Sequence, residues 1–76
     1  MNVASPDRRQ IGKVKFFDKE RGFGFVTPEE GGRDVFVHIS AVERAGLSTL
    51  REGQKVAYET ETGRNGKVAA INLKVI

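Results

Sequence analysis

The sequence predicts an all-β protein in which five short strands form an antiparallel barrel with one short helical turn. Three observations support this fold class. Five segments carry apolar β-forming residues at period two, polar or glycine-rich stretches separate them, and only one stretch is compatible with a helix. Because an open sheet leaves its edge strands exposed, closure into a barrel is the expected arrangement for so short a chain.

The size and composition of the chain indicate one small domain. A chain of 76 residues is expected to bury only about 60% of its unfolded surface, so its core is small. Cysteine is lacking, which excludes disulfides and thiolate metal sites. No apolar run has the length of a signal or transmembrane segment, and we therefore expect a cytoplasmic protein without membrane contact.

The chain begins with a segment that shows no periodicity. We expect residues 1–10 to form a flexible tail and residues 11–76 to form the folded domain. The first strand is predicted over residues 11–18. Strict alternation along it places Phe17 outside with Lys13 and Lys15, and Phe16 inside. A β-bulge would instead expose both rings, and the sequence leaves these alternatives open.

The second and third strands carry the most unusual pattern in the chain. They are predicted over residues 22–27 and 34–39, after a polar turn at 18–21 and a flexible acidic loop at 29–33. Phe23 and Phe25 share one face of the second strand, and Phe36 and His38 share one face of the third. The opposite faces hold glycine and β-branched residues, which suffice for a small core. We therefore expect the rings to form an exposed aromatic face.

The remaining elements are a short helix and two further strands. Ser40 to Glu43 resembles a capping box, with Gly46 as the end of the helix. A fourth strand is predicted over residues 54–62, a turn at 63–66 because Asn-Gly is a strong hairpin signal, and a fifth strand over 67–75. The residues expected to point inward are Val56 and Tyr58 in the fourth strand and Val68, Ala70, Ile71, Leu73 and Val75 in the fifth.

The distribution of charge indicates a polyanionic partner. The first 21 residues hold six of the 13 basic residues but only three of the ten acidic ones, so the whole excess of +3 lies beside the aromatic face. Unpaired bases stack on aromatic rings, and lysine and arginine hold phosphates. Enzyme signatures are lacking, since the segment 63–67 is too short for a phosphate-binding loop and one histidine without cysteine makes nucleophile–base pairs scarce. We expect neither catalytic residues nor a metal or other cofactor.

Two families of nucleic-acid-binding domains share part of this pattern. The segment RGFGFV (residues 21–26) matches the start of the RNA-recognition-motif signature, but Pro28 replaces its final aromatic residue and the two required helices are missing. The chain resembles the cold-shock domain more closely over residues 11–75. The motifs that carry this resemblance are GKVKFF (12–17), RGFGFV (21–26), DVFVHISAV (34–42) and EGQKV (52–56).

The resemblance implies a five-stranded OB-fold barrel without a cofactor; we expect a monomer, and the sequence leaves a domain-swapped dimer open. It implies binding of single-stranded RNA and DNA, as an RNA chaperone or as a regulator of transcription or translation. The residues implied to stack on bases are Phe16, Phe17, Phe23, Phe25, Phe36 and His38. The residues implied to border them with charge and hydrogen bonds are Lys13, Lys15, Asp18 and Arg21.

Three departures from the family pattern reduce the stacking area. Phe16 stands where tryptophan is common, Ile39 where phenylalanine is common, and Leu47 where an aromatic residue often occurs. We therefore expect weaker binding than in a typical member. The alternative from another functional class is a small β-barrel that binds proteins, with the phenylalanine face as a peptide groove.

Overall fold

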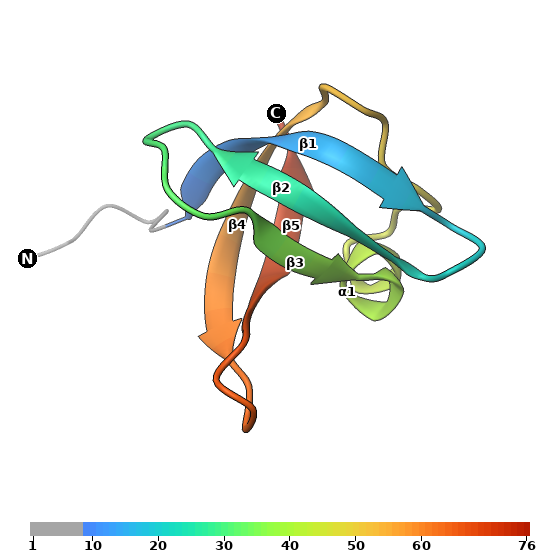
Figure 1. Ribbon diagram of the computed structural model, residues 1–76. Coiled ribbons are helices and arrows are strands. Elements are labelled where there is room, and N and C mark those ends of the chain that lie inside the picture. Colours follow the sequence, from blue (N-terminus) through green and yellow to red (C-terminus); the bar gives the residue numbers. More distant parts are fainter. Residues whose placement is uncertain (1–8) are drawn as a thin grey trace, which may run out of the picture.

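The computed structural model describes residues 9–76, which form five strands and one short helix (Figure 1). Along the chain these are β1 (Gln10–Asp18), β2 (Phe23–Pro28), β3 (Val35–His38), α1 (Ile39–Arg44), β4 (Lys55–Thr62) and β5 (Val68–Val75). The predicted all-β fold class and the five predicted strands are confirmed. The predicted tail lies mostly outside the described residues, and its last residue, Gln10, begins β1.

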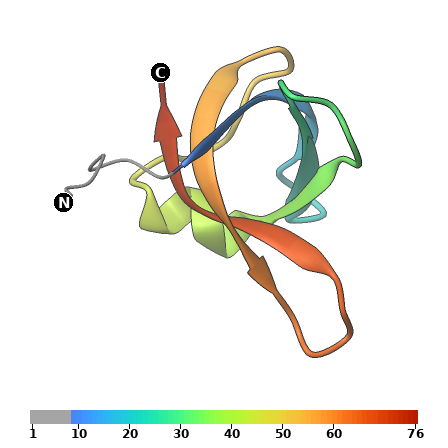
Figure 2. The same cartoon turned by 90° about the vertical axis from the view of Figure 1, so that its left-hand side faces the viewer.

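The five strands close into a barrel in the order β1-β2-β3-β5-β4. Strand β1 pairs with both β2 and β4, and these pairings, like β2 with β3 and β4 with β5, are antiparallel. The exception to the predicted antiparallel pairing is β3 with β5, which run parallel and are joined at Phe36 and Ala69. Figure 2 shows the strands curving around the barrel, while the end of the β4–β5 hairpin extends beyond it.

The interior of the barrel is filled mainly by small side chains. Of the residues that the structure describes, six valines are buried there, together with alanines, two leucines and Tyr58, which is the largest fully buried one among them. The Tyr58 hydroxyl finds no hydrogen-bond partner within residues 9–76. Its burial raises the pKa of the phenol above the ordinary value of 10.0, and the negative charge of Glu30 adds to the effect.

A β-bulge in β1 decides which phenylalanine faces the interior. The pairing with β2 shifts between Val14 and Phe16, so that Phe16 lies opposite Phe25 and Phe17 opposite Gly24. Phe16 is therefore exposed, whereas Phe17 is half-buried and packs against the core. Strict alternation was wrong for both rings. The bulge alternative was right for Phe16 but wrong in expecting Phe17 to be exposed as well.

Helix α1 begins earlier than the capping-box pattern predicted. Its N-cap is His38, which has extended backbone angles and whose side chain accepts a hydrogen bond from the backbone of Ser40. The predicted cap at Ser40 was therefore wrong, because the backbone N–H group of Ser40 is itself capped by the His38 ring. Gly46 follows the helix with a φ of 80°, as expected for the residue that ends it. No helix within residues 9–76 is both long and apolar enough to span a membrane.

Strand β5 buries fewer side chains than its pattern predicted. Ala70 and Leu73 are buried, but Val68 is 43% exposed and Val75 38% exposed, and Ile71 is only half-buried. An extra residue in β5 opposite β4 shifts the register, and Asn72 adopts a φ of 51° there. The prediction for Val68 and Val75 was wrong, because both valines lie at the ends of the strand, beyond the part of it that covers the core.

Candidate nucleic-acid interface

The outer face of strands β1–β3 carries a continuous cluster of rings, which we call the ring surface. It consists of Phe16 from β1, Phe23 and Phe25 from β2, and Phe36 and His38 from β3. Strand register places these side chains side by side, with Phe25 between Phe16 and Phe36 and with Phe23 opposite His38. Neighbouring ring centroids lie 5.5–6.4 Å apart.

The rings support one another while keeping part of their area exposed. Phe25 meets Phe23 and Phe36 edge to face, at interplanar angles of 83° and 76°. Such contacts are favourable for aromatic pairs and hold each ring in a defined orientation. Phe16 is 38% exposed and the other phenylalanines are half-buried, so the cluster offers pre-positioned faces to a planar ligand.

The backbone beneath the ring surface is closely packed. A Cβ atom at Gly24 would lie 2.7 Å from the Cα atom of Phe17, so only glycine allows β2 to approach the bulged part of β1. The motif RGFGFV therefore combines rings that point outward with a glycine that permits close approach. Five of the six predicted stacking side chains meet in the cluster, and Phe17 does not, because the bulge turns it toward the core.

The predicted cations lie around the ring surface, and two of them are paired with carboxylates. Lys15 Nζ lies 3.0 Å from Asp34 Oδ2, and Arg21 Nε lies 3.6 Å from Asp18 Oδ2. The side chains of Lys15 and Arg21 are 59% and 75% exposed, so these ion pairs are weak and can exchange for a phosphate. Lys13 is exposed on β1 and forms no ion pair within residues 9–76.

Asp18 has a structural role in the turn before β2. Its Oδ1 accepts hydrogen bonds from the backbone N–H groups of Glu20, at 3.0 Å, and Arg21, at 3.1 Å. The same carboxylate pairs with the Arg21 side chain. Asp18 therefore fixes the turn that connects the motif KFF of β1 to the motif GFGFV of β2.

Asp34 is a polar residue of this region that sequence reasoning missed. It accepts hydrogen bonds from Lys15 Nζ and Thr27 Oγ1, both at 3.0 Å. Both hydrogen bonds lower the pKa of Asp34 below its ordinary value. The bond from Lys15 has the larger effect and the bond from Thr27 the smaller one. The register of β2 with β3 cannot be deduced across the flexible loop at 29–33. The sequence therefore offered no direct signal that the side chains of Lys15, Thr27 and Asp34 meet.

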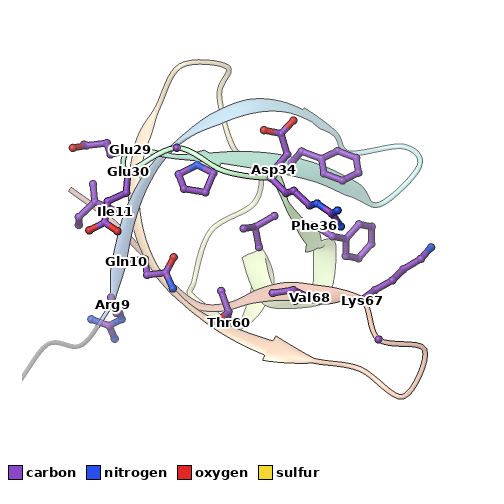
Figure 3. A pocket seen from close by; sticks show the side chains of 16 residues that line it. Arg9, Gln10, Ile11, Glu29, Glu30, Asp34, Phe36, Thr60, Lys67 and Val68 are labelled. Atoms are coloured by element: carbon purple, nitrogen blue, oxygen red, sulfur yellow. The ribbon is translucent and has the colours of Figure 1, made fainter.

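A cleft of about 1000 Å³ adjoins the ring surface between the β2–β3 loop and the β4–β5 hairpin. Phe25 and Phe36 contribute to its wall, so the cleft continues from the ring surface. Figure 3 shows Phe36 and Lys67 extending to one side of it, whereas Glu29 and Glu30 lie on the other side. Lys67 therefore places a cation on the side of the cleft that adjoins the ring surface. Sequence reasoning had not assigned Lys67 to the site.

Of the three positions that depart from the family pattern, Phe16 belongs to the ring surface, whereas Ile39 and Leu47 lie outside it. Leu47 packs against the core, and Ile39 lies half-buried beside Gly22, whose carbonyl accepts a hydrogen bond from the Ile39 backbone at 2.8 Å. Within residues 9–76 no group of histidine and carboxylate side chains is arranged to hold a metal ion. The arrangement is suited to stacking and to phosphate contacts.

Comparison with known proteins agrees with this geometry. The "Cold-shock" DNA-binding domain family matches residues 10–76. The chain is 56% identical over 64 residues to a probable cold shock protein, y4cH, of Sinorhizobium fredii, covering 83% of this chain and 93% of that protein.

Two further relatives show the same level of similarity. The cold shock-like protein CspA of Rickettsia bellii is 52% identical over 65 residues, covering 86% of this chain and 91% of the relative. The cold shock-like protein CspE of Escherichia coli K12 is 52% identical over 59 residues, covering 78% and 86% respectively. Because the match spans the whole barrel at this identity, the chain belongs to the cold-shock family of nucleic-acid-binding domains.

Proposed function

We propose that this protein binds single-stranded RNA and DNA on the ring surface, as a monomer in the cytoplasm. One observation carries the proposal, namely that four phenylalanines and a histidine lie together on the outer face of β1–β3 instead of in the core. Bases in a duplex already stack on one another and hide their faces, whereas unpaired bases can stack on these rings. Stacking of this kind tolerates many sequences because every base has a π-face.

The surrounding charges support a strand that crosses the rings. Lys13 forms no ion pair among residues 9–76, and the pairs of Lys15 with Asp34 and of Arg21 with Asp18 are exposed. A phosphate can therefore replace a carboxylate at either cation at small cost. Binding only the open form of an RNA shifts its folding equilibrium by mass action, which is the basis of an RNA chaperone or of a regulator that keeps a transcript unpaired.

Isothermal titration calorimetry with pyrimidine-rich single strands, RNA and DNA, and with matched duplexes tests the proposal. We expect single strands to bind and duplexes to bind far more weakly. With about three to five phosphate contacts, the slope of log affinity against log salt should be about −2 to −3.5. Lys13→Gln should flatten that slope by about 0.7 for all sequences alike.

The matched control is Lys74→Gln, which removes an exposed lysine from β5, outside the ring surface. It should leave the slope unchanged. Equal affinity for duplexes, or an affinity that does not change with salt, would contradict the proposal and would favour a peptide as the ligand of the phenylalanine face. Sedimentation of the free protein as a dimer would contradict the monomeric state.

A further inference from the structure

The two ring nitrogens of His38, the only histidine in the chain, have different surroundings. Nδ1 lies 3.1 Å from the backbone N of Ser40 and 2.9 Å from Ser40 Oγ. His38 is the N-cap of α1, with φ −91° and ψ 149°. Within residues 9–76 no hydrogen bond to Nε2 is present, and the residue is exposed. One nitrogen therefore serves the fold and the other is available at the surface.

The contact with Ser40 decides which nitrogen carries the proton. A backbone N–H group can only donate, so Nδ1 must accept and must be unprotonated. In a neutral imidazole the single proton then resides on Nε2. The Ser40 hydroxyl can donate to the same nitrogen and strengthens this preference. The neutral His38 ring thus presents an N–H donor, and not an acceptor, beside Phe36, whose centroid lies 6.4 Å away.

We propose that His38 divides two tasks between its nitrogens. Nδ1 caps α1, with Ser40 as the positioning residue that holds the tautomer and the ring orientation. Nε2–H donates to a hydrogen-bond acceptor of the bound strand, either a carbonyl oxygen of a base or a phosphate oxygen. The inference rests on the proposed single-strand binding and adds to stacking a directional contact that a phenylalanine at this position cannot make.

Two variants separate the tasks, because asparagine and glutamine each reproduce one nitrogen of histidine. In His38→Asn the side-chain oxygen takes the place of Nδ1, since asparagine is a good N-cap, but the donor is lost. In His38→Gln the amide nitrogen reaches about as far as Nε2, but the cap is lost. Both variants lack the ring, so the loss of stacking is the same in each and cancels in the comparison.

We expect opposite orders for stability and for binding. His38→Asn should melt within about 2 °C of the wild type and His38→Gln about 4–8 °C lower, as expected for the loss of one N-cap in a domain of this size. For an oligothymidylate, His38→Gln should bind about 3- to 10-fold more tightly than His38→Asn, which corresponds to one hydrogen bond. Equal melting temperatures, or equal affinities, of the two variants would overturn the proposal.

Ring-nitrogen chemical shifts provide a readout that a purely structural role would not produce. For the neutral imidazole of the free wild type, NMR should show Nδ1 as the unprotonated nitrogen and Nε2 as the protonated one. Ser40→Ala should shift this balance toward exchange between the tautomers, and Ser40→Thr should restore it. A dominant Nδ1–H tautomer in the wild type would overturn the proposal.

The same His38 variants can identify the acceptor on the bound strand, and they can also test the proposed single-strand binding itself. Abasic nucleotides placed along the oligothymidylate remove the carbonyl acceptors but keep the phosphates. If the ratio between the glutamine and asparagine variants disappears at one position, the acceptor is a base; if it persists throughout, the acceptor is a phosphate. Absence of binding by the wild type would contradict single-strand binding itself, whereas binding with equal variants would contradict only this inference.

Discussion

The two faces of strands β1–β3 are built from different side chains, although they alternate along the same backbone. The inner face holds buried valines, such as Val14, Val26 and Val37. The outer face holds the ring surface, where Phe16 remains 38% exposed. Burial explains the inner face, since valine both favours strands and fills a small barrel. It does not explain why the largest apolar side chains lie outside, and an exposed apolar patch with charges around it is typical of a binding site.

This difference means that stability and binding depend on alternating residues of the same strands. The backbone must therefore hold the two sets strictly apart. The space between the two faces is smallest at Gly24. This residue lies on the inner face between Phe23 and Phe25 and packs against the bulged part of β1. Substitutions on the two faces should have separable effects, and the predictions below test that separation.

The largest effect is expected for Gly24→Ala. The new methyl group would lie 2.7 Å from both the Cα atom and a ring carbon of Phe17, so backbone and core must shift together. We expect a loss of about 3 kcal/mol in the free energy of unfolding, measured by urea denaturation, because overpacking against backbone cannot relax easily. Gly63→Ala is the control, since its nearest contact is a side-chain oxygen at 3.3 Å. Equal stability of the two variants would show that β1 and β2 are not closely packed here.

Next in size is the contrast between Phe36→Ala and Val37→Ala, which are neighbours on opposite faces of β3. Phe36→Ala should weaken single-strand binding by about 1–3 kcal/mol in calorimetry. Val37→Ala should instead reduce the free energy of unfolding by about 1.5–3 kcal/mol, because it deletes fully buried methyl groups. Binding by the Val37 variant should be unchanged below its melting temperature. If Phe36→Ala unfolds the protein, the ring belongs to the core.

A gain of stability is expected for Tyr58→Phe. The Tyr58 hydroxyl is buried without a partner within residues 9–76, so its removal should stabilise the fold by about 1 kcal/mol. The raised pKa adds a pH dependence. Because the folded state holds the phenolic proton more strongly, the wild type is fully stabilised below the ordinary pKa of 10.0 and loses stability as the pH rises from there through the folded-state pKa. Denaturation measured below and above pH 10.0 should show this loss at the higher pH in the wild type but not in the variant.

The smallest effect is expected for Phe16→Trp. Because the bulge exposes Phe16, a larger ring can be accommodated without overpacking, and the melting temperature should not change. The larger π-face should strengthen binding of pyrimidine-rich single strands by about 0.5–1 kcal/mol, a fraction of a full stacking contact. Phe17→Trp serves as the comparison, since its ring packs against the core and its enlargement should lower the melting temperature. Destabilisation by Phe16→Trp without tighter binding would mean that Phe16 packs inward in solution.

Most of the fold could be predicted from the sequence because period-two alternation and turn residues are local signals. The strand positions, the turn at Asn65-Gly66 and the inward side chains of β4 follow from them. The bulges could not be placed in this way. In β1 the bulge reverses the positions of Phe16 and Phe17, and in β5 the extra residue near Asn72 lets Ala70 and Leu73, three positions apart, both face inward. Such an insertion is decided by the partner strand, which the sequence of one strand does not contain.

The candidate site shows the same limit. The rings of Phe23, Phe25 and Phe36 could be assigned to one face because each lies on a regular strand. Contacts between distant residues could not be foreseen. These are the Lys15–Asp34 pair across 19 residues, the approach of Lys67 to the cleft beside Phe36, and the cap formed by His38 in place of Ser40. Each depends on register between strands or on the entry angle of a helix.

The burial of Tyr58 has a consequence for spectroscopy. The chain has one tyrosine and no tryptophan, so its intrinsic fluorescence originates in the interior, and none of the ring surface emits appreciably. Emission from the native protein therefore reports on the integrity of the barrel and is largely insensitive to what lies on the outer face. A tryptophan at position 16 would add a second emitter at the surface, at longer wavelength, so that one sample could follow unfolding and ligand occupancy as two separate optical signals.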